Sequence, residues 1–327
     1  MNIKNILITG GTGSLGQALV RHFLNNKNYK KIVVYSRDEL KQFEMQKQFS
    51  PNQLKRIRFF IGDIRDLNRL KIAFNNIDLV IHAAALKQVD TAEYNPTEYI
   101  KTNIYGAQNI IEACYESNIK KVIALSTDKA TSPINLYGAT KLCSDKLFIA
   151  AGNFMTKTNF SIIKYGNVVS SRGSVIPVLK KQFLNKQKYL TITDPEMTRF
   201  SLEMNKCLKI IDWSIINSQG SEIIIPKLKS YKILELAKAI NSKIKIKIIG
   251  IRPGEKISEE MISVSESRYC YDIGDYYILI PNKNLRTIKH YKKKFKAKLV
   301  KNNFYYDSSS NKDFLTIKEL RNIISKN

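Results

Sequence analysis

Two side chains suited to redox chemistry, Tyr137 and Lys141, stand four residues apart. On a helix this spacing places them on one face. A nearby ammonium favours the ionised form of a phenol, so the pair could take a proton from a sugar or alcohol hydroxyl while a nicotinamide accepts the hydride. Asp128 and Lys129 precede them and add an acid and a base that simple alcohol oxidation does not need. Together the four residues predict an oxidation followed by an elimination.

A glycine-rich turn near the N-terminus predicts the nucleotide site that this chemistry requires. Residues 5–9 form an apolar run typical of a buried parallel strand, and residues 17–24 are apolar at helical spacing. Glycines between a strand and a helix let the backbone approach a pyrophosphate, and the helix N-terminus offers free N–H groups to it. The expected contacts in this turn are Gly10, Thr12, Gly13, Ser14, Leu15 and Gly16.

The end of the second strand, residues 31–35, indicates which cofactor is bound. A carboxylate directly at this position binds the ribose hydroxyls of NAD, but Ser36 and Arg37 are there instead. An arginine can hold the 2′-phosphate of NADP. We therefore predict NADP, with a solvated surface arginine as the alternative. Asp63, after a third strand at residues 57–61, is expected near the adenine.

The alternation of strands and helices predicts an α/β fold built on a right-handed, doubly wound parallel sheet of the Rossmann type. A fourth strand at residues 78–81 leads into His82, which we expect to be packed rather than catalytic, and into small residues that lie against the cofactor. Without a clear linker, we assign residues 1–165 to an NADP-binding domain and residues 166–327 mainly to a smaller α/β substrate domain. Residues 202–226 are expected to cross back to the first domain.

Composition excludes several other classes of protein. The chain has 327 residues, a formal net charge of +26 and a hydrophobic fraction of 43%. The lysines are spread along the chain without a nucleic-acid-binding motif, so a nucleic-acid partner is not expected. No run of 18 uncharged apolar residues suggests a membrane span, and the early first strand leaves no room for a signal peptide. We expect a cytoplasmic protein whose four cysteines are free thiols, with no metal site.

Short motifs along nearly the whole chain carry a family resemblance. They comprise residues 9–16, 36–42, 83–89, 93–96, 101–103, 125–130, 137–141, 165–167, 197–200 and 251–256. The chain resembles the extended short-chain dehydrogenases/reductases, and within them the inverting UDP-N-acetylglucosamine 4,6-dehydratases that begin pseudaminic acid synthesis. The triplet Thr127-Asp128-Lys129 is the most specific motif, because retaining dehydratases carry Thr-Asp-Glu there and sugar 4-epimerases lack the acid pair.

The resemblance implies a mechanism. Tyr137 would deprotonate the hydroxyl on carbon 4 of the sugar while the hydride passes to NADP, with Lys141 lowering the pKa of the tyrosine and holding the nicotinamide ribose. Lys129 would remove the proton on carbon 5, for which burial or a cationic neighbour must depress its pKa. Asp128 would protonate the leaving hydroxyl on carbon 6. The hydride would then return to carbon 6, and carbon 5 would be protonated on the opposite face.

The resemblance also implies the sets of residues that act in this mechanism. The expected catalytic residues are Thr127, Asp128, Lys129, Tyr137 and Lys141. Further cofactor contacts are expected from Ser36, Arg37, Asp38, Lys41, Asp63, Ile64, Ala83, Ala84, Lys87, Val168, Tyr137 and Lys141. Substrate contacts are expected from Lys87, Ser126, Thr127, Asn167, Arg172, Arg199, Arg252 and Glu255. The implied substrate is UDP-N-acetylglucosamine, and the implied assembly is a homo-oligomer, possibly a hexamer.

Rival interpretations remain open at this point. A retaining dehydratase or a 4-epimerase of the same family would keep Tyr137 and Lys141 without needing Lys129. A non-catalytic NADP-sensing protein is a rival from another class, although such proteins usually lose the tyrosine or the lysine.

Overall fold

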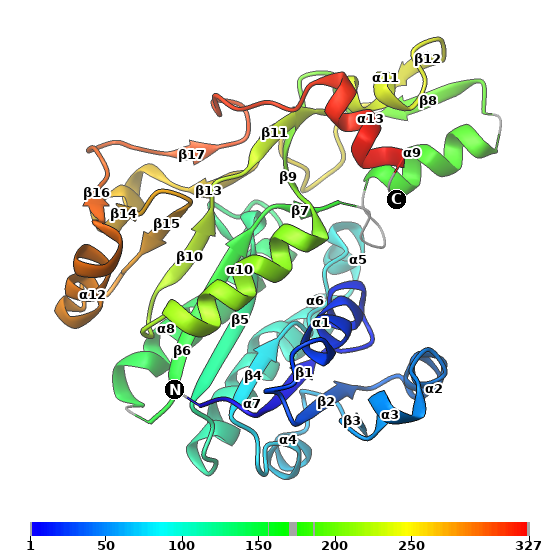
Figure 1. The fold of residues 1–327 in the computed structure, drawn as a ribbon. Helices are drawn as coiled ribbons and strands as arrows, with labels where there is room; N and C mark the ends of the chain where they lie inside the picture. Colours follow the sequence, from blue (N-terminus) through cyan, green and yellow to red (C-terminus); the bar gives the residue numbers. More distant parts are fainter. Residues whose placement is uncertain (1, 156, 170–174, 186, 326–327) are drawn as a thin grey trace.

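One large mixed sheet organises the protein (Figure 1). The computed structural model describes residues 2–155, 157–169, 175–185 and 187–325. Among these residues the sheet has ten strands. In spatial order they are β16 (Lys298–Leu299), β14 (Cys270–Asp272), β15 (Tyr276–Leu279), β10 (Ile223–Pro226), β6 (Asn159–Tyr165), β5 (Lys121–Thr127), β4 (Leu79–His82), β1 (Asn5–Thr9), β2 (Lys31–Ser36) and β3 (Ile57–Ile61).

The strand order confirms the predicted doubly wound sheet. From one edge it runs β3, β2, β1, β4, β5, β6, all parallel, which is the strand order of a dinucleotide-binding Rossmann fold. The order reverses between β1 and β4, and ligands of such sheets bind beyond the carboxyl ends of the strands at this point. β10 extends the parallel part beside β6, and β15, β14 and β16 continue it as antiparallel strands.

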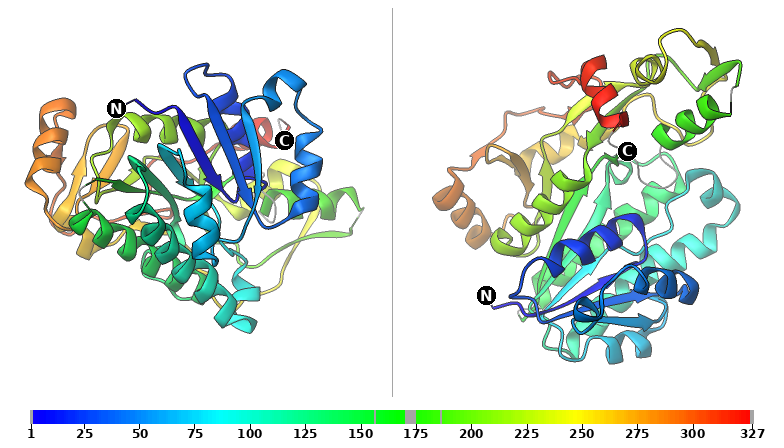
Figure 2. Two further views of the ribbon diagram at one scale, coloured as in Figure 1. Left: turned by 90° about the horizontal axis from the view of Figure 1, so that it is seen from below. Right: turned by 45° about the vertical axis from the view of Figure 1, so that its right-hand side comes forward.

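Helices cover both faces of this sheet, as connections between parallel strands require. The helices are α1 (Ser14–Leu24), α2 (Glu39–Gln46), α3 (Pro51–Leu54), α4 (Leu67–Ala73), α5 (Val89–Tyr94), α6 (Pro96–Tyr99), α7 (Gly106–Tyr115), α8 (Leu136–Phe154), α9 (Val175–Leu184), α10 (Met204–Asn217), α11 (Ile233–Ile240), α12 (Leu285–Phe295) and α13 (Ile317–Ser325). α1 and α10 pack together over one face, and α4, α7 and α8 pack together over the other (Figures 1 and 2). No helix in the described part of the chain is long and apolar enough to cross a membrane.

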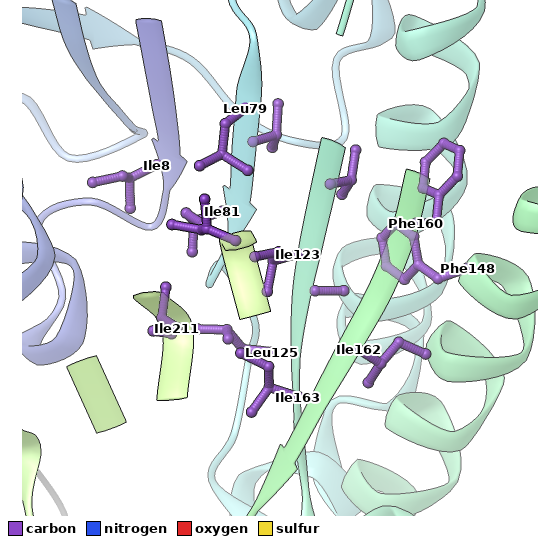
Figure 3. Packing of buried hydrophobic residues seen from close by; sticks show 14 of the residues in the cluster. Ile8, Leu79, Ile81, Ile123, Leu125, Phe148, Phe160, Ile162, Ile163 and Ile211 are labelled. Carbon is purple, nitrogen blue, oxygen red and sulfur yellow. The ribbon is translucent and has the colours of Figure 1, made fainter. Parts of the chain in front are cut away.

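The main hydrophobic core lies between these layers. Strand side chains such as Ile8, Ile81 and Ile123 are completely buried, and Figure 3 shows them beside residues of the neighbouring strands and helices. Strands buried on both faces need continuous apolar runs, which is why β1, β4 and β5 read as such in the sequence. α10 also packs on this core, and its Trp213 contacts Tyr276 at the large sheet.

A second, smaller core belongs to a lobe beyond the carboxyl ends of the strands (Figure 2). It is formed by α9, α11 and α13, with β8 (Tyr189–Ile192) parallel to β12 (Lys245–Ile248). Small strands join this lobe to the large sheet. They are β7 (Asn167–Val168), β9 (Thr198–Leu202), β11 (Lys229–Lys232), β13 (Glu260–Ile262) and β17 (Tyr306–Asp307). The lobe therefore faces the edge of the sheet at which a ligand would bind.

Candidate active site

A cavity of about 780 Å³ runs from the turn after β1 to the smaller lobe. Its wall brings together almost all of the residues that the sequence predicted for the site. They are Gly10, Thr12, Gly13, Ser14, Leu15, Gly16, Ser36, Arg37, Asp38, Lys41, Asp63, Ile64, Ala83, Ala84, Lys87, Ser126, Thr127, Lys129, Tyr137, Lys141, Asn167, Val168, Arg199, Arg252 and Glu255. Asp128 lies buried behind this wall, and Arg172 lies outside the described residues.

The turn between β1 and α1 has the shape of a pyrophosphate cradle. Gly10 has a φ of 66°, and a Cβ on it would lie 2.9 Å from the backbone of Ala84. A Cβ on Gly16 would lie 2.6 Å from the Gly10 carbonyl oxygen, so side chains are excluded from both positions. α1 begins without a side-chain cap and without an acidic residue in its first turn. Its free N–H groups therefore face the cavity ready for an anion, and the residues fit a dinucleotide.

At the end of β2 the charges are arranged in pairs. The Asp38 carboxylate accepts a hydrogen bond from the Lys41 backbone N–H, which caps α2, and pairs with the Lys41 ammonium. Arg37 is half exposed, with Nη1 3.6 Å from Asp63 Oδ2. The Ser36 hydroxyl lies 2.8 Å from the Thr12 hydroxyl. The carboxylate nearest this strand end is thus committed to capping a helix, while the guanidinium of Arg37 borders the cavity.

Tyr137 and Lys141 lie in the first turns of α8, whose N-terminus is fixed by Asn135. The Asn135 side chain accepts a hydrogen bond from the Gly138 N–H and donates one to the Gly254 carbonyl oxygen, at 2.8 Å each. Lys141 Nζ donates to the Leu125 carbonyl oxygen at 2.8 Å. The Asn135 side chain thus connects α8, the helix that carries the predicted base Tyr137, to the turn at residues 251–256.

The acidity of Tyr137 differs from the prediction. Burial raises its pKa to about 12, and the charge of Lys129 and a hydrogen bond with Thr127 act in the opposite direction without outweighing it. Burial dominates this pKa, and the ammonium with the largest lowering effect is that of Lys129, while the effect of Lys141 on the phenol stays a prediction. Burial also lowers the pKa of Lys141 itself.

A buried cluster of charges adjoins Tyr137. Lys129 Nζ lies 3.1 Å from Asp128 Oδ1 and 2.8 Å from Glu259 Oε1. Arg199 Nε lies 3.5 Å from the same Glu259 oxygen. Asp128 and Glu259 are almost completely buried, whereas the Lys129 side chain is 21% exposed. Two carboxylates and two cations therefore share one side of the cavity.

This cluster overturns the prediction that Lys129 has a depressed pKa. Burial acts to lower the pKa of Lys129, but the negative charges of Asp128 and Glu259 outweigh it, so the pKa is raised. A cationic neighbour, the other source of a depressed pKa that the prediction named, is present in Arg199, but its effect is smaller. Burial raises the pKa of Asp128, and Glu259 adds to this while Lys129 opposes it. The resting pair is thus an ammonium beside a carboxylate with a raised proton affinity.

Thr127 connects this cluster to the cavity. Its hydroxyl donates to Asp128 Oδ1 at 3.0 Å and also forms the hydrogen bond with Tyr137. Asp128 is fully buried, and its Oδ2 has no hydrogen-bond partner among the described residues. Gly166 lies beside that oxygen, since a Cβ on it would be in ordinary van der Waals contact with Oδ2 at 3.4 Å. Asp128 therefore faces the cavity only through its neighbours.

On the side of the smaller lobe, the predicted arginines differ in their surroundings. Arg199 is 8% exposed, and its Nη1 donates to the carbonyl oxygens of Thr198 and Ile257. Arg252 is half exposed on a turn that is closed by the Glu255 N–H donating to the Arg252 carbonyl oxygen at 3.1 Å. Exposed donors on Arg252 can reach a ligand directly, whereas those of Arg199 mostly serve the protein.

Three further residues that the sequence predicted for substrate binding are Ser126, Asn167 and Lys87, and two of them form hydrogen bonds within the protein. The Ser126 hydroxyl donates to Asp145 Oδ2 at 2.6 Å, so it is engaged within the protein. Asn167 hydrogen-bonds the Tyr231 side chain. Burial lowers the pKa of Lys87. His82 is buried with Nδ1 2.9 Å from the Thr9 hydroxyl, in agreement with the expected packing role.

Sequence reasoning missed Glu259 and the π-helical segment around Asn103, although it expected Asn103 to organise the backbone of the active site. Glu259 is 130 residues from Lys129, and no spacing rule links the two. Asn103 lies in a π-helical segment, Ile100–Tyr105, and its amide exchanges two hydrogen bonds of 2.9 Å with the Leu86 backbone. π-helical turns are frequent at functional sites. This amide fixes the backbone that lines the cavity after β4.

Comparisons with known proteins show which proteins this chain is similar to. The family model described as "Polysaccharide biosynthesis protein" matches residues 6–281. A Campylobacter jejuni protein (serotype O:23/36, strain 81-176) named UDP-N-acetylglucosamine 4,6-dehydratase (inverting) is 50% identical over 99% of this chain and 98% of its own. A Rickettsia bellii protein (strain OSU 85-389) named UDP-glucose 4-epimerase is 43% identical over 88% and 86%. The X-ray structure of Pen from Bacillus thuringiensis, 36% identical, superposes with a TM-score of 0.89 over 99% and 98% of the two chains.

Proposed function

Because this chain belongs to the polysaccharide biosynthesis protein family, a group of extended short-chain dehydrogenases/reductases, we propose that it is an inverting UDP-N-acetylglucosamine 4,6-dehydratase. The observation that carries the proposal is the cluster of Asp128, Lys129 and Glu259 beside Tyr137, in which Lys129 and Glu259 line the cavity and Asp128 lies directly behind Lys129. Oxidation of an alcohol needs only Tyr137 and its positive surroundings. A buried acid and base next to it serve the loss of water.

Tyr137 would take the proton of the hydroxyl on carbon 4. Bound NADP would supply hydride chemistry, accepting the hydride of carbon 4 and later returning it to carbon 6. The turn from Gly10 to Gly16 would hold the pyrophosphate, and Lys141 the nicotinamide ribose. The ketone formed at carbon 4 makes the neighbouring hydrogen on carbon 5 acidic. The cavity wall offers Lys129 as the base for this hydrogen.

A neutral Lys129 would arise by proton transfer to Asp128 Oδ1, 3.1 Å away. This single transfer converts the ion pair into the acid and the base that the elimination needs, with no exchange of protons with solvent. Thr127 would relay the proton of Asp128 to the leaving hydroxyl on carbon 6, because its hydroxyl borders both the cavity and Asp128 Oδ1. After water leaves, Lys129 is again an ammonium and Asp128 a carboxylate.

A 4-epimerase is the second candidate, because the Rickettsia bellii relative carries that name. Epimerisation at carbon 4 requires the oxidation and a return of the hydride to the other face of the same carbon. Epimerisation at carbon 4 does not require an acid and a base that act on carbons 5 and 6. The buried charges around Lys129 therefore favour the dehydratase, since desolvated charges that serve no reaction cost stability.

Proton NMR of the purified protein with NADP and UDP-N-acetylglucosamine in heavy water tests the proposed function. We expect a 4-keto-6-deoxy sugar with deuterium at carbon 5 and the L-arabino configuration. The D-xylo configuration would instead identify a retaining dehydratase. Formation of the carbon 4 epimer, with carbon 6 still hydroxylated, would identify an epimerase and contradict the assignment of Lys129.

We propose NADP rather than NAD because of the charges at the end of β2. The guanidinium of Arg37 borders the cavity, and the carboxylate of Asp38 is occupied with the Lys41 backbone and ammonium. The 2′-phosphate of NADP could bind the side chains of Arg37 and Lys41, which both line the cavity. The ribose hydroxyls of NAD would have no free carboxylate to bind directly at the end of β2.

Replacing Arg37 with alanine is expected to weaken NADP binding roughly 30-fold, because a charge-assisted hydrogen bond contributes about 2 kcal/mol. NAD binding should change little, since NAD lacks the phosphate. Calorimetric titration of each variant with NADP and with NAD measures the two dissociation constants and their ratio. Lys47→Ala is a matched control, because Lys47 is an exposed cation at the end of α2 that does not line the cavity. Equal losses for NADP and NAD in Arg37→Ala would contradict the preference.

We also propose that the protein acts in the cytoplasm, as a homo-oligomer, at the first step of pseudaminic acid synthesis. The support is the resemblance of the whole chain to enzymes of that step, together with cysteines that are free thiols in the described residues.

A further inference from the structure

Glu259 is a buried carboxylate that the proposed mechanism does not use. It is 2% exposed, yet it forms part of the cavity wall. Its Oε1 lies 2.8 Å from Lys129 Nζ and 3.5 Å from Arg199 Nε. Its Oε2 has no hydrogen-bond partner among the described residues. A second carboxylate, from a segment 130 residues away in the sequence, is therefore in contact with the ammonium of Lys129.

The backbone around Glu259 is fixed on both sides. The Glu259 N–H donates to the Ser308 hydroxyl and its carbonyl oxygen accepts from the Ser308 N–H, at 2.9 Å each. The next residue, Glu260, accepts a hydrogen bond of 2.6 Å from the Ser132 hydroxyl. Lys256 Nζ donates to the Ser132 carbonyl oxygen at 2.6 Å. The segment with Glu259 is thus tied to the end of β5, and its carboxylate has a defined position relative to Lys129.

A base that removes a proton can also return it to the same face of the same carbon. Return by Lys129 would restore the original configuration at carbon 5. Inversion requires that the ammonium keep the proton until carbon 5 has received another one from the opposite face. Two carboxylates in hydrogen-bonding contact with one ammonium stabilise its charged form and direct its N–H groups towards themselves.

We infer that Glu259 is a positioning residue that sets the stereochemical outcome at carbon 5, by holding the ammonium of Lys129 away from same-face return of its proton. The inference rests on the proposed inverting dehydration. In it the C5–H bond breaks and its proton forms an N–H bond on neutral Lys129. The electron pair of that bond forms the C5=C6 double bond, and the C6–O bond breaks to release water with the proton delivered from Asp128.

The remaining steps balance in the same way. The hydride taken from carbon 4 adds to carbon 6, and a proton from solvent water adds to carbon 5 on the face opposite Lys129. The ammonium of Lys129 passes its proton to the Asp128 carboxylate, which has lost one to the leaving group. The proton that Tyr137 took from the carbon 4 hydroxyl passes to solvent, which balances the proton that carbon 5 received, and the enzyme is then ready for another turnover. Glu259 stays ionised throughout and neither gains nor loses a proton.

The test is the ratio of the two carbon 5 epimers formed in the first turnover by Glu259→Gln. The glutamine keeps the shape and can still accept a hydrogen bond from Lys129, but it lacks the charge. We expect the share of D-xylo product relative to L-arabino product to rise roughly 10- to 100-fold over wild type. In heavy water, the D-xylo fraction should retain protium at carbon 5 more often than the L-arabino fraction. This ratio does not depend on how much of the enzyme is active, so partial unfolding does not change it.

Glu260→Gln is the matched control, because it makes the same change one residue away in a carboxylate that contacts Ser132 and not Lys129. Its epimer ratio should equal that of wild type. Unchanged L-arabino selectivity in Glu259→Gln would overturn the inference while leaving the proposed function intact. Wild type that makes no L-arabino product would overturn both.

Glu259→Asp keeps the charge but withdraws it by one methylene, and it serves if the glutamine variant makes no product. We expect the aspartate variant to turn over with an intermediate epimer ratio. A complete loss of turnover in both folded variants would contradict the inference, because Glu259 would then be needed for the reaction itself rather than for its stereochemistry. As a further control, the isolated L-arabino product is incubated with each variant. Any D-xylo product formed in this incubation reflects later epimerisation and is subtracted from the D-xylo fraction of the turnover experiment.

Discussion

Lys129→Arg is expected to abolish the loss of water from carbon 6 while leaving the oxidation of carbon 4 nearly intact. Arginine keeps the positive charge between Asp128 and Glu259, but its guanidinium does not deprotonate. The loss of a general base typically costs between about 10²- and 10⁴-fold, so dehydration should fall by roughly 10³-fold. Single-turnover absorbance of the reduced cofactor measures the oxidation, and NMR of the sugar measures the dehydration.

Lys129→Met separates the charge of this residue from its role as a base. Because the Lys129 charge lowers the pKa of Tyr137, methionine should slow the oxidation as well as the dehydration. It also removes the cation that the two buried carboxylates share, and Glu259 then keeps only Arg199 nearby, so the folded protein should be less stable than the arginine variant. Dehydration at nearly the wild-type rate in Lys129→Arg would show that another group removes the carbon 5 proton.

Tyr137→Phe is expected to remove both steps, because the elimination needs the ketone that the oxidation provides. The ring is almost completely buried, and phenylalanine fills the same space, so the fold should be retained. The oxidation should slow by roughly 10³-fold, as for the loss of a proton-transfer group. Reduced cofactor should therefore not accumulate in a single turnover with this variant.

The pH dependence of the oxidation gives a second readout for Tyr137. A phenol with a pKa of about 12 is almost entirely protonated at neutral pH. Its ionised fraction increases about tenfold per pH unit below the pKa, so the wild-type oxidation rate should rise from about pH 7 to about pH 9. The residual rate of Tyr137→Phe should lack this rise.

Tyr99→Phe is the control for the phenol. Tyr99 is buried in the same small apolar cluster as Tyr137, and its hydroxyl donates to the Gln88 carbonyl oxygen at 2.6 Å, but it does not line the cavity. Its loss should affect stability more than the rate of oxidation. Equal losses of rate in the two variants would mean that the phenol of Tyr137 is not the base.

The sequence by itself determined the nucleotide half of the site. Gly10 and Gly16 stand between a strand and a helix, and both the need for glycine and the cradle it forms are local properties of that turn. The parallel sheet was also predictable from local sequence, because strands that are buried on both faces appear as continuous apolar runs. The spacing of Tyr137 and Lys141 likewise placed both on α8, because helical periodicity depends only on neighbouring residues.

Only the tertiary structure decided the charge state of the predicted base. Sequence reasoning required a depressed pKa for Lys129, but the charge of Asp128 raises it instead, and Glu259, which approaches from 130 residues away, adds to this effect. The same holds for Asp128, which adjoins Lys129 in the chain but lies behind the cavity wall, so that Thr127 and Lys129 connect it to the cavity. A pKa depends on burial and on charges within a few ångströms, and these are set by which distant segments pack together. Local sequence patterns are enough to predict which residues react, whereas long-range packing determines which of these residues are protonated before the reaction.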